Sequence, residues 1–174
     1  TIALGLVFAA SLLFAGEDAY IQKSLQRAGK NRAEIQTALT QVPRPQRQGM
    51  RFLIRYMPTP DLQNLSAEFL LENTKYAYQA WQESPWKDQI PEAIFFNNVL
   101  PYASINERRD RWRKDFFERF RPLVKTAKTP GQAAALLNQK IFPLLKVRFS
   151  TARPKADQSP YETIKAKMAS CTGL

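Results

Sequence analysis

Apolar side chains recur every three or four residues along most of this chain, as in the sets Met50, Leu53, Ile54, Met57 and Trp112, Phe116, Phe120. Residues with this spacing share one face of an α-helix, so both sets predict amphipathic helices packed on a core. A longer helix is predicted to run to about Gln82, and its apolar face is predicted to hold Leu65, Phe69, Tyr76, Ala80 and Trp81. The pattern therefore predicts a mainly α chain of six to eight helices.

Several helix starts are marked by capping residues. Asn31 followed by Glu34 has the spacing of a capping box, in which each side chain bonds a backbone N–H of the first turn. Asn106 is predicted to cap a helix from Glu107 to about Arg121. Thr129 and Ser159 each precede a proline, which favours the first helical position. Ser159 is therefore expected to begin a short helix that ends near Met168.

Prolines and β-branched residues indicate where helices stop. Pro122 is predicted to end or kink the helix before it, and Pro143 is predicted to break the helix that begins after Thr129. Val147 and Phe149 alternate with polar residues, which makes residues 146–151 the single predicted strand.

The N-terminal residues 2–14 form an uncharged apolar run that is followed by Gly16, Glu17 and Asp18. Thirteen residues are short for a bilayer span, but they suit the apolar region of a secretory signal. Residues 1–19 are therefore interpreted as a signal-peptide-like segment whose start is truncated. This predicts export to the periplasm or the extracellular space and no stable membrane span. An uncleaved anchor is the alternative.

The chain has 26 Lys and Arg against 15 Asp and Glu, a net charge of +11. Such a balance can indicate an anionic partner, or a basic segment of a longer protein. The charges alternate in sign: Glu107–Arg111, Asp110–Lys114 and Asp115–Arg119 would all pair on a helix. We therefore expect a solvated, ion-paired helix face and no nucleic-acid partner.

Chemistry that depends on histidine is excluded within these residues, because the sequence contains none. With one cysteine and no histidine, zinc and haem sites are excluded, and no metal or other cofactor is expected. A Ser-His-Asp arrangement is excluded as well. Cys171 cannot form an internal disulfide, so it is either a free reactive thiol or an inert buried one.

The segments Gln158–Ile164 and Met168–Leu174, which ends Ser170-Cys171-Thr172-Gly173-Leu174, resemble the entry to the core of bacterial transglutaminase-like proteins. Transglutaminase-like proteins belong to the papain-like cysteine superfamily. The segments Ser84–Trp86, Val99–Tyr102 and Asn106–Arg109 resemble the helical region before that core. The resemblance implies an irregular helical region, residues 20–145, leading into a truncated α+β core, residues 146–174.

The resemblance also implies that Cys171 is the nucleophile, at the start of a helix, and that it acts on amide bonds of a protein or peptide through a thioester. Transfer to an amine and hydrolysis both remain open. In the family, strands beyond the cysteine supply a histidine and an aspartate. Lys165 stands where papain has a glutamine, so only the backbone N–H of Cys171 is assigned to the oxyanion hole.

Three functional interpretations follow from the sequence. The first is the N-terminal part of an exported transglutaminase-like cysteine enzyme, inert as given because no histidine is present. The second is a non-enzymatic basic helical module that binds an anionic surface. The third is a binding protein whose catalytic triad has degenerated. The first also predicts that residues after about Pro143 are poorly held, because their core partners are missing.

Overall fold

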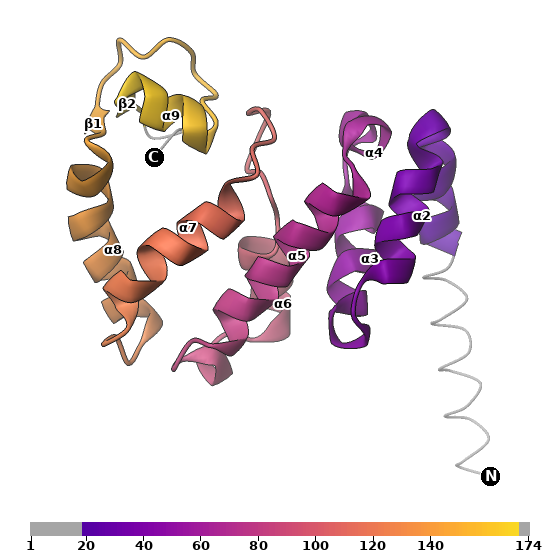
Figure 1. Cartoon of the computed structure of the whole chain (residues 1–174), viewed down its shortest axis with the longest axis horizontal. Coiled ribbons are helices and arrows are strands. Elements are labelled where there is room, and N and C mark those ends of the chain that lie inside the picture. Colours follow the sequence, from indigo (N-terminus) through magenta and orange to yellow (C-terminus); the bar gives the residue numbers. More distant parts are fainter. Residues whose placement is uncertain (1–18, 171–174) are drawn as a thin grey trace. The chain divides into compact units, whose positions relative to one another are not determined.

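The computed structural model describes residues 19–170, and this part of the chain is mainly α-helical, as the sequence predicts (Figure 1). The helices are residues 19–27, α2 (Arg32–Gln41), α3 (Arg47–Tyr56), α4 (Thr59–Asn64), α5 (Ala67–Gln82), α6 (Glu92–Ile94), α7 (Trp112–Phe120), α8 (Pro130–Leu145) and α9 (Pro160–Ala166). Short 3-10 turns connect several of them, and η4 (Phe95–Val99) is a π-helical turn. The strands are β1 (Arg148–Phe149) and β2 (Met168–Ala169).

The described residues form two compact units. One ends at Thr74, and the other begins at Lys75, within α5. The predicted segment boundaries at residues 19 and 145 stay predictions. The apolar run 2–14 lies outside the described residues. Within residues 19–170, no helix combines the length and apolar character that crossing a membrane requires.

The first unit is built on the predicted periodicity of α3. Met50, Leu53 and Ile54 are all buried, and so are side chains of the other helices of this unit, among them Ile21, Leu25, Ile35, Leu62 and Leu70. Removing such apolar area from water is the main favourable term in folding. The helical spacing of these three residues therefore correctly predicts the buried face of α3.

The capping box predicted at Asn31 and Glu34 is wrong. Asn31 precedes α2, but its side chain makes no cap bond there. Its amide donates instead to the carbonyls of Leu62 and Leu65, at 2.9 and 2.8 Å. The Glu34 carboxylate accepts from the N–H of Ala67, the first residue of α5, at 2.7 Å. Both side chains satisfy backbone groups elsewhere in the first unit, and this tertiary use outweighs the local one.

An aromatic cluster forms the core of the second unit. Phe95 is fully buried, and its ring stacks on Trp81 with the centroids 4.3 Å apart. Tyr78 meets the same ring edge-on at 4.7 Å. Pairs of this kind contribute about 0.5–1.5 kcal/mol beyond the area that they bury. Trp81 thus packs on the core, as predicted for its face of α5, whereas Tyr76 on the same predicted face is only half-buried and the buried Tyr78 was not predicted there.

Helix α7 begins later than predicted, at Trp112 rather than Glu107. Glu107 belongs to a turn before the helix, where its carboxylate accepts from the N–H groups of Ser104 and Ile105 at 2.5 and 2.7 Å. The predicted end is confirmed, since α7 stops at Phe120 and passes into a 3-10 turn that contains Pro122.

Helix α8 does not break at Pro143, in contrast to the prediction. It begins as predicted, with the Thr129 hydroxyl accepting from the N–H of Gln132 at 3.2 Å, and it continues to Leu145. Pro143 removes only one bond near the end of the helix. The last turn is closed by Lys146, which has a left-handed backbone conformation and donates its N–H to the carbonyl of Pro143.

Strands β1 and β2 lie side by side next to α9 and pair in parallel, with Arg148 opposite Met168 and Phe149 opposite Ala169 (Figure 1). Residues 148–149 fall within the predicted strand. The segment at Met168 was predicted as helix, and the structure corrects this, since α9 ends at Ala166.

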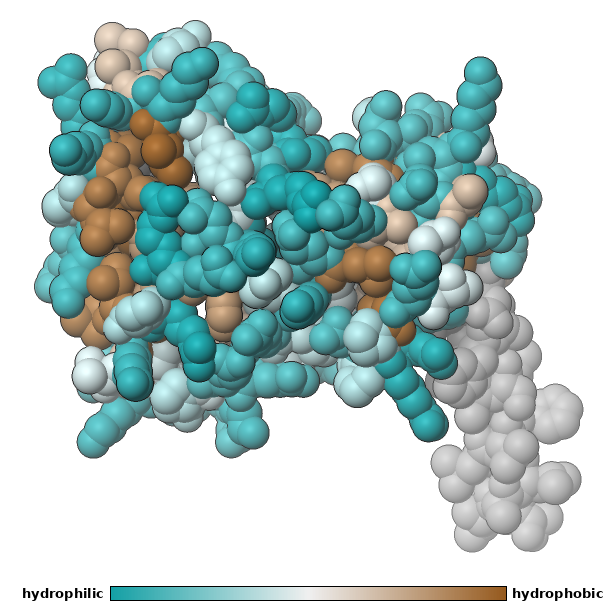
Figure 2. Space-filling model, in the orientation of Figure 1, coloured by the Kyte–Doolittle hydropathy of each residue, from teal (hydrophilic) through white to brown (hydrophobic). Residues whose placement is uncertain are grey.

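The expected loose packing after Pro143 holds for part of the segment only. Phe149 and Leu144 are 63% and 51% exposed, and Figure 2 shows apolar side chains gathered over α8. By contrast, six later residues are buried, so the prediction is wrong for the end of the described chain; these include Val147, Gln158, Ser159, Thr163, Ala169 and Ser170.

Candidate functional site

Cys171, the nucleophile implied by the resemblance, lies outside the described residues, which end at Ser170. The backbone just before it is held by β1. The N–H of Arg148 donates to the carbonyl of Lys167 at 3.1 Å, and the N–H of Ser150 donates to that of Ala169 at 2.8 Å. Ala169 and Ser170 are both buried. The chain therefore approaches Cys171 through a paired and buried segment.

Helix α9 precedes this segment and has a complete capping box. The Ser159 hydroxyl accepts from the N–H of Glu162 at 3.3 Å, and the Glu162 carboxylate accepts from the N–H of Ser159 at 2.9 Å. Lys155 lies 2.9 Å from the same carboxylate. The bond from the Ser159 N–H, followed by the contact with Lys155, lowers the pKa of Glu162 to about 2. The helix start predicted at Ser159 is thus confirmed.

Asp110 connects the loop before α7 to the N-terminus of α9. Its carboxylate accepts from the backbone N–H of Tyr161 at 2.9 Å and from Nε of Arg108 at 2.8 Å. The Asp110 side chain is only 5% exposed. The Tyr161 hydroxyl donates in turn to the carbonyl of Arg111 at 3.2 Å. Two hydrogen bonds between residues about fifty positions apart therefore hold α9 in place.

The loop that presents Asp110 is shaped by Glu107. Burial alone would raise the pKa of Glu107, but the hydrogen bonds from Ser104 and Ile105 and the charge of Arg109 outweigh burial, so its pKa lies below the ordinary value. This carboxylate therefore stays ionised, and it organises the turn that leads to Asp110.

Gln158 is a buried polar residue without an evident structural role. It is 4% exposed, and neither its amide nitrogen nor its amide oxygen has a hydrogen-bond partner among the protein groups that the structure describes. A buried amide that is left unpaired costs about 1–3 kcal/mol. The sequence singled out this residue only as part of the segment that resembles the family.

Of the three ion pairs predicted for α7, Asp115–Arg119 lies within the helix. Arg119 contacts Asp115 at 2.9 Å, one helical turn apart. Glu107 and Asp110 precede α7, so they do not share a helix face with the basic residues that follow them. Since the charges are interleaved, the surface of α7 gives the basic-module interpretation no specific support, and that interpretation stays a prediction.

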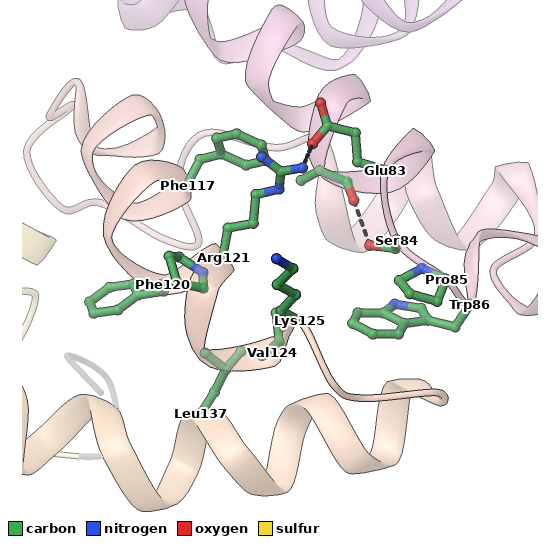
Figure 3. Close-up of a pocket in the computed structure, with 12 residues that line it drawn as sticks. Glu83, Ser84, Pro85, Trp86, Phe117, Phe120, Arg121, Val124, Lys125 and Leu137 are labelled. Atoms are coloured by element: carbon green, nitrogen blue, oxygen red, sulfur yellow. Dashed lines mark hydrogen bonds and ion pairs between the residues drawn. The ribbon is translucent and has the colours of Figure 1, made fainter.

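A pocket with a volume of about 600 Å³ lies within the second unit, between the end of α5, the turn after it, the end of α7 and α8 (Figure 3). Its walls are mostly apolar. Charged groups come from Glu83, Arg121 and Lys125. The apolar lining residues are Ala80, Pro85, Trp86, Phe117, Phe120, Pro122, Val124 and Leu137. Sequence reasoning missed this pocket, because the lining residues come from segments far apart in the chain.

Residues 19–170 contain no group of three or more acidic or cysteine side chains placed to hold a metal ion. Comparisons with known proteins add no identification: no family model, no curated protein and no solved structure matches this chain.

Proposed function

We propose that this chain carries the nucleophile segment of an exported transglutaminase-like cysteine enzyme that acts on amide bonds, with Cys171 as the nucleophile. The observation that carries the proposal is the pairing of β2 with β1, which hydrogen-bonds the backbone up to Ala169. Together with the Ser-Cys-Thr-Gly-Leu motif, this pairing supports the proposal, because the cysteine follows a paired and buried segment. A nucleophile needs such support, because misplacement by about 1 Å lowers the rate about a hundredfold.

The proposed chemistry proceeds through a thioester. The Cys171 thiolate attacks the amide carbonyl carbon, a C–S bond forms, and the C–N bond breaks as the leaving amine takes a proton. An amine or water then attacks the thioester and releases the thiolate. The proton transfers require a base such as imidazole. These 174 residues include no histidine, so we assign them the nucleophile and its support, not a complete triad.

The nucleophile assignment is tested by alkylating the chain with iodoacetamide across pH 5–10. Cys171 is the one cysteine, so labelling by mass spectrometry reports on it alone, with Cys171→Ser as the blank. We expect the rate to rise with an apparent pKa below the ordinary value of about 8.5, as for thiols at helix N-termini. A thiol that stays unlabelled, or that titrates at or above the ordinary value, would contradict the assignment.

The reaction class is tested on the polypeptide encoded by the whole reading frame. Incubation with a glutamine-containing peptide and hydroxylamine should give a peptide hydroxamate, because hydroxylamine captures a thioester. Cys171→Ser should abolish the product. A product that persists in this variant would place the chemistry at another residue.

A further inference from the structure

The pocket in the second unit has the form of a small-molecule site. Its volume of about 600 Å³ lies within the usual range for ligand pockets, about 300–1,000 Å³. Its walls combine flat aromatic surfaces, such as Trp86 and Phe117, with aliphatic ones from α8, such as Leu137 (Figure 3). Such walls would bind the apolar body of a ligand by excluding water from it.

Most polar groups of the pocket already have partners. Arg121 contacts the carboxylate of Glu83 at 2.5 Å, and its guanidinium lies over the ring of Phe117 at 5.4 Å. The Ser84 hydroxyl donates to the carbonyl of Ala80 at 2.6 Å. The Glu83–Arg121 pair is neutral as a unit. A ligand therefore gains little from these groups, and an anion meets no unpaired carboxylate in the pocket lining.

Lys125 is the exception. In the close-up, its ammonium points into the space between Arg121 and Trp86 (Figure 3). In the described part of the chain, no carboxylate lies within ion-pair distance of it. The pocket lining thus combines apolar walls with one exposed positive charge that has no acidic partner in the described part of the chain. The complementary ligand has an apolar body and one negative charge.

We propose that this pocket binds a small amphipathic monocarboxylate, with its apolar body between Trp86, Phe117 and Leu137 and its carboxylate on the Lys125 ammonium. A polyanion such as a nucleotide is disfavoured, because Glu83 is part of the lining and Lys125 is the one cation there that lacks an acidic partner. The site is independent of Cys171, so this inference and the proposed function succeed or fail separately.

The test uses 6-phenylhexanoate as the probe, with 6-phenylhexanol as the neutral and 6-phenylhexylamine as the cationic comparison. Binding is measured by isothermal titration calorimetry and by the change in tryptophan fluorescence. A ligand of this size should bind with a Kd on the order of 0.1–1 mM. We expect the acid to bind more tightly than the alcohol, because its carboxylate pairs with Lys125. The difference should be only about fivefold, because Lys125 is exposed to solvent. The amine should bind most weakly.

Variants identify the site. Lys125→Met should bring the affinities for acid and alcohol within about twofold of each other, whereas Lys128→Met, at an exposed lysine outside the lining, should keep the preference. Leu137→Trp should weaken both probes at least about tenfold by filling the pocket, and Val124→Phe serves the same purpose if that variant unfolds. Leu144→Trp, on the exposed part of α8, is the matched control and should bind as the wild type does.

Three results would overturn the inference. The first is an alcohol that binds as tightly as the acid. The second is a preference for the acid that survives Lys125→Met. The third is binding that withstands both filling variants while their circular dichroism spectra remain those of the folded chain, since the ligand would then lie elsewhere.

Discussion

The carboxylate of Asp110 is a single group whose removal tests how α9 is held. In Asp110→Ala, the backbone N–H of Tyr161 loses its acceptor at 2.9 Å, in the first turn of α9. A hydrogen bond to a charged group contributes about 1.5–3 kcal/mol, and the carboxylate also interacts favourably with the positive end of the helix. Because the side chain is only 5% exposed, we expect a loss of about 2 kcal/mol.

This loss should appear as a fall in the Tm of about 4–8 °C, with an unchanged denaturant slope in urea unfolding followed by tryptophan fluorescence. Asp110→Asn keeps an acceptor and should lose less. Hydrogen exchange measured on peptides that cover residues 158–170 should rise in Asp110→Ala, because the helix N-terminus is no longer tied down.

Asp157→Ala is the matched control. It removes a carboxylate from the loop that enters α9, and this carboxylate has no hydrogen-bond or ion-pair partner in the described part of the chain. We expect its stability to stay within about 0.5 kcal/mol of the wild type. The reasoning is refuted if Asp110→Ala lowers the free energy of unfolding by less than about 0.5 kcal/mol, or if both variants lower it by the same amount.

Three further predictions concern the same end of the chain. Glu162→Gln should lower the free energy of unfolding by about 1 kcal/mol at neutral pH. The wild type retains this contribution above pH 5 and loses it as the pH falls toward 2, because the pKa of Glu162 is lowered to about 2 in the folded chain. Urea titrations at several pH values measure the difference. Gln158→Leu should raise the free energy of unfolding by about 1 kcal/mol, since two buried and unpaired polar atoms disappear. Lys146→Gly should raise it by about 0.5–1 kcal/mol, because the backbone is left-handed there; thermal melts measure both.

Each of these predictions has its own control. Stability differences between Glu162→Gln and the wild type that are equal at pH 7 and pH 2 would contradict the pKa argument. Gln158→Asn keeps the amide and should not stabilise. Lys140→Gly places the same substitution inside α8 and should destabilise by about 1 kcal/mol; equal effects at the two lysines would contradict the assigned backbone conformation.

Helices whose signals are local were predictable from the sequence. The spacing of Met50, Leu53 and Ile54 gave α3 and its buried face, and Thr129 and Ser159 marked the starts of α8 and α9 correctly. At Thr129 and Ser159, the backbone N–H that the hydroxyl satisfies lies three positions along the chain. Local reasoning therefore has all of the relevant partners in view.

Most errors arise where a side chain or strand has a distant partner. Asp110 has helical spacing to Lys114, but its carboxylate accepts from the N–H of Tyr161, 51 positions away. Glu107 is an exception, because its partners are close in the chain: its carboxylate accepts from the N–H groups of Ser104 and Ile105 in a turn. Met168 and Ala169 favour a helix by composition, and only the pairing with β1 makes them a strand. The pocket residues carry no shared local signal at all, and Cys171 was identified through a family motif alone.

The β1–α9–β2 arrangement has a consequence for the order of folding. Arg148 pairs with Met168, 20 positions later, whereas the Asp110–Tyr161 bond spans 51 positions. Closing the longer loop costs more chain entropy, so we expect the strand pair to form early and the docking onto Asp110 to come late. Asp110→Ala should then act mainly by accelerating unfolding, with little change in the folding rate. In kinetic terms, the hydrogen bond to Asp110 determines the lifetime of the folded segment before Cys171, and not how fast that segment forms.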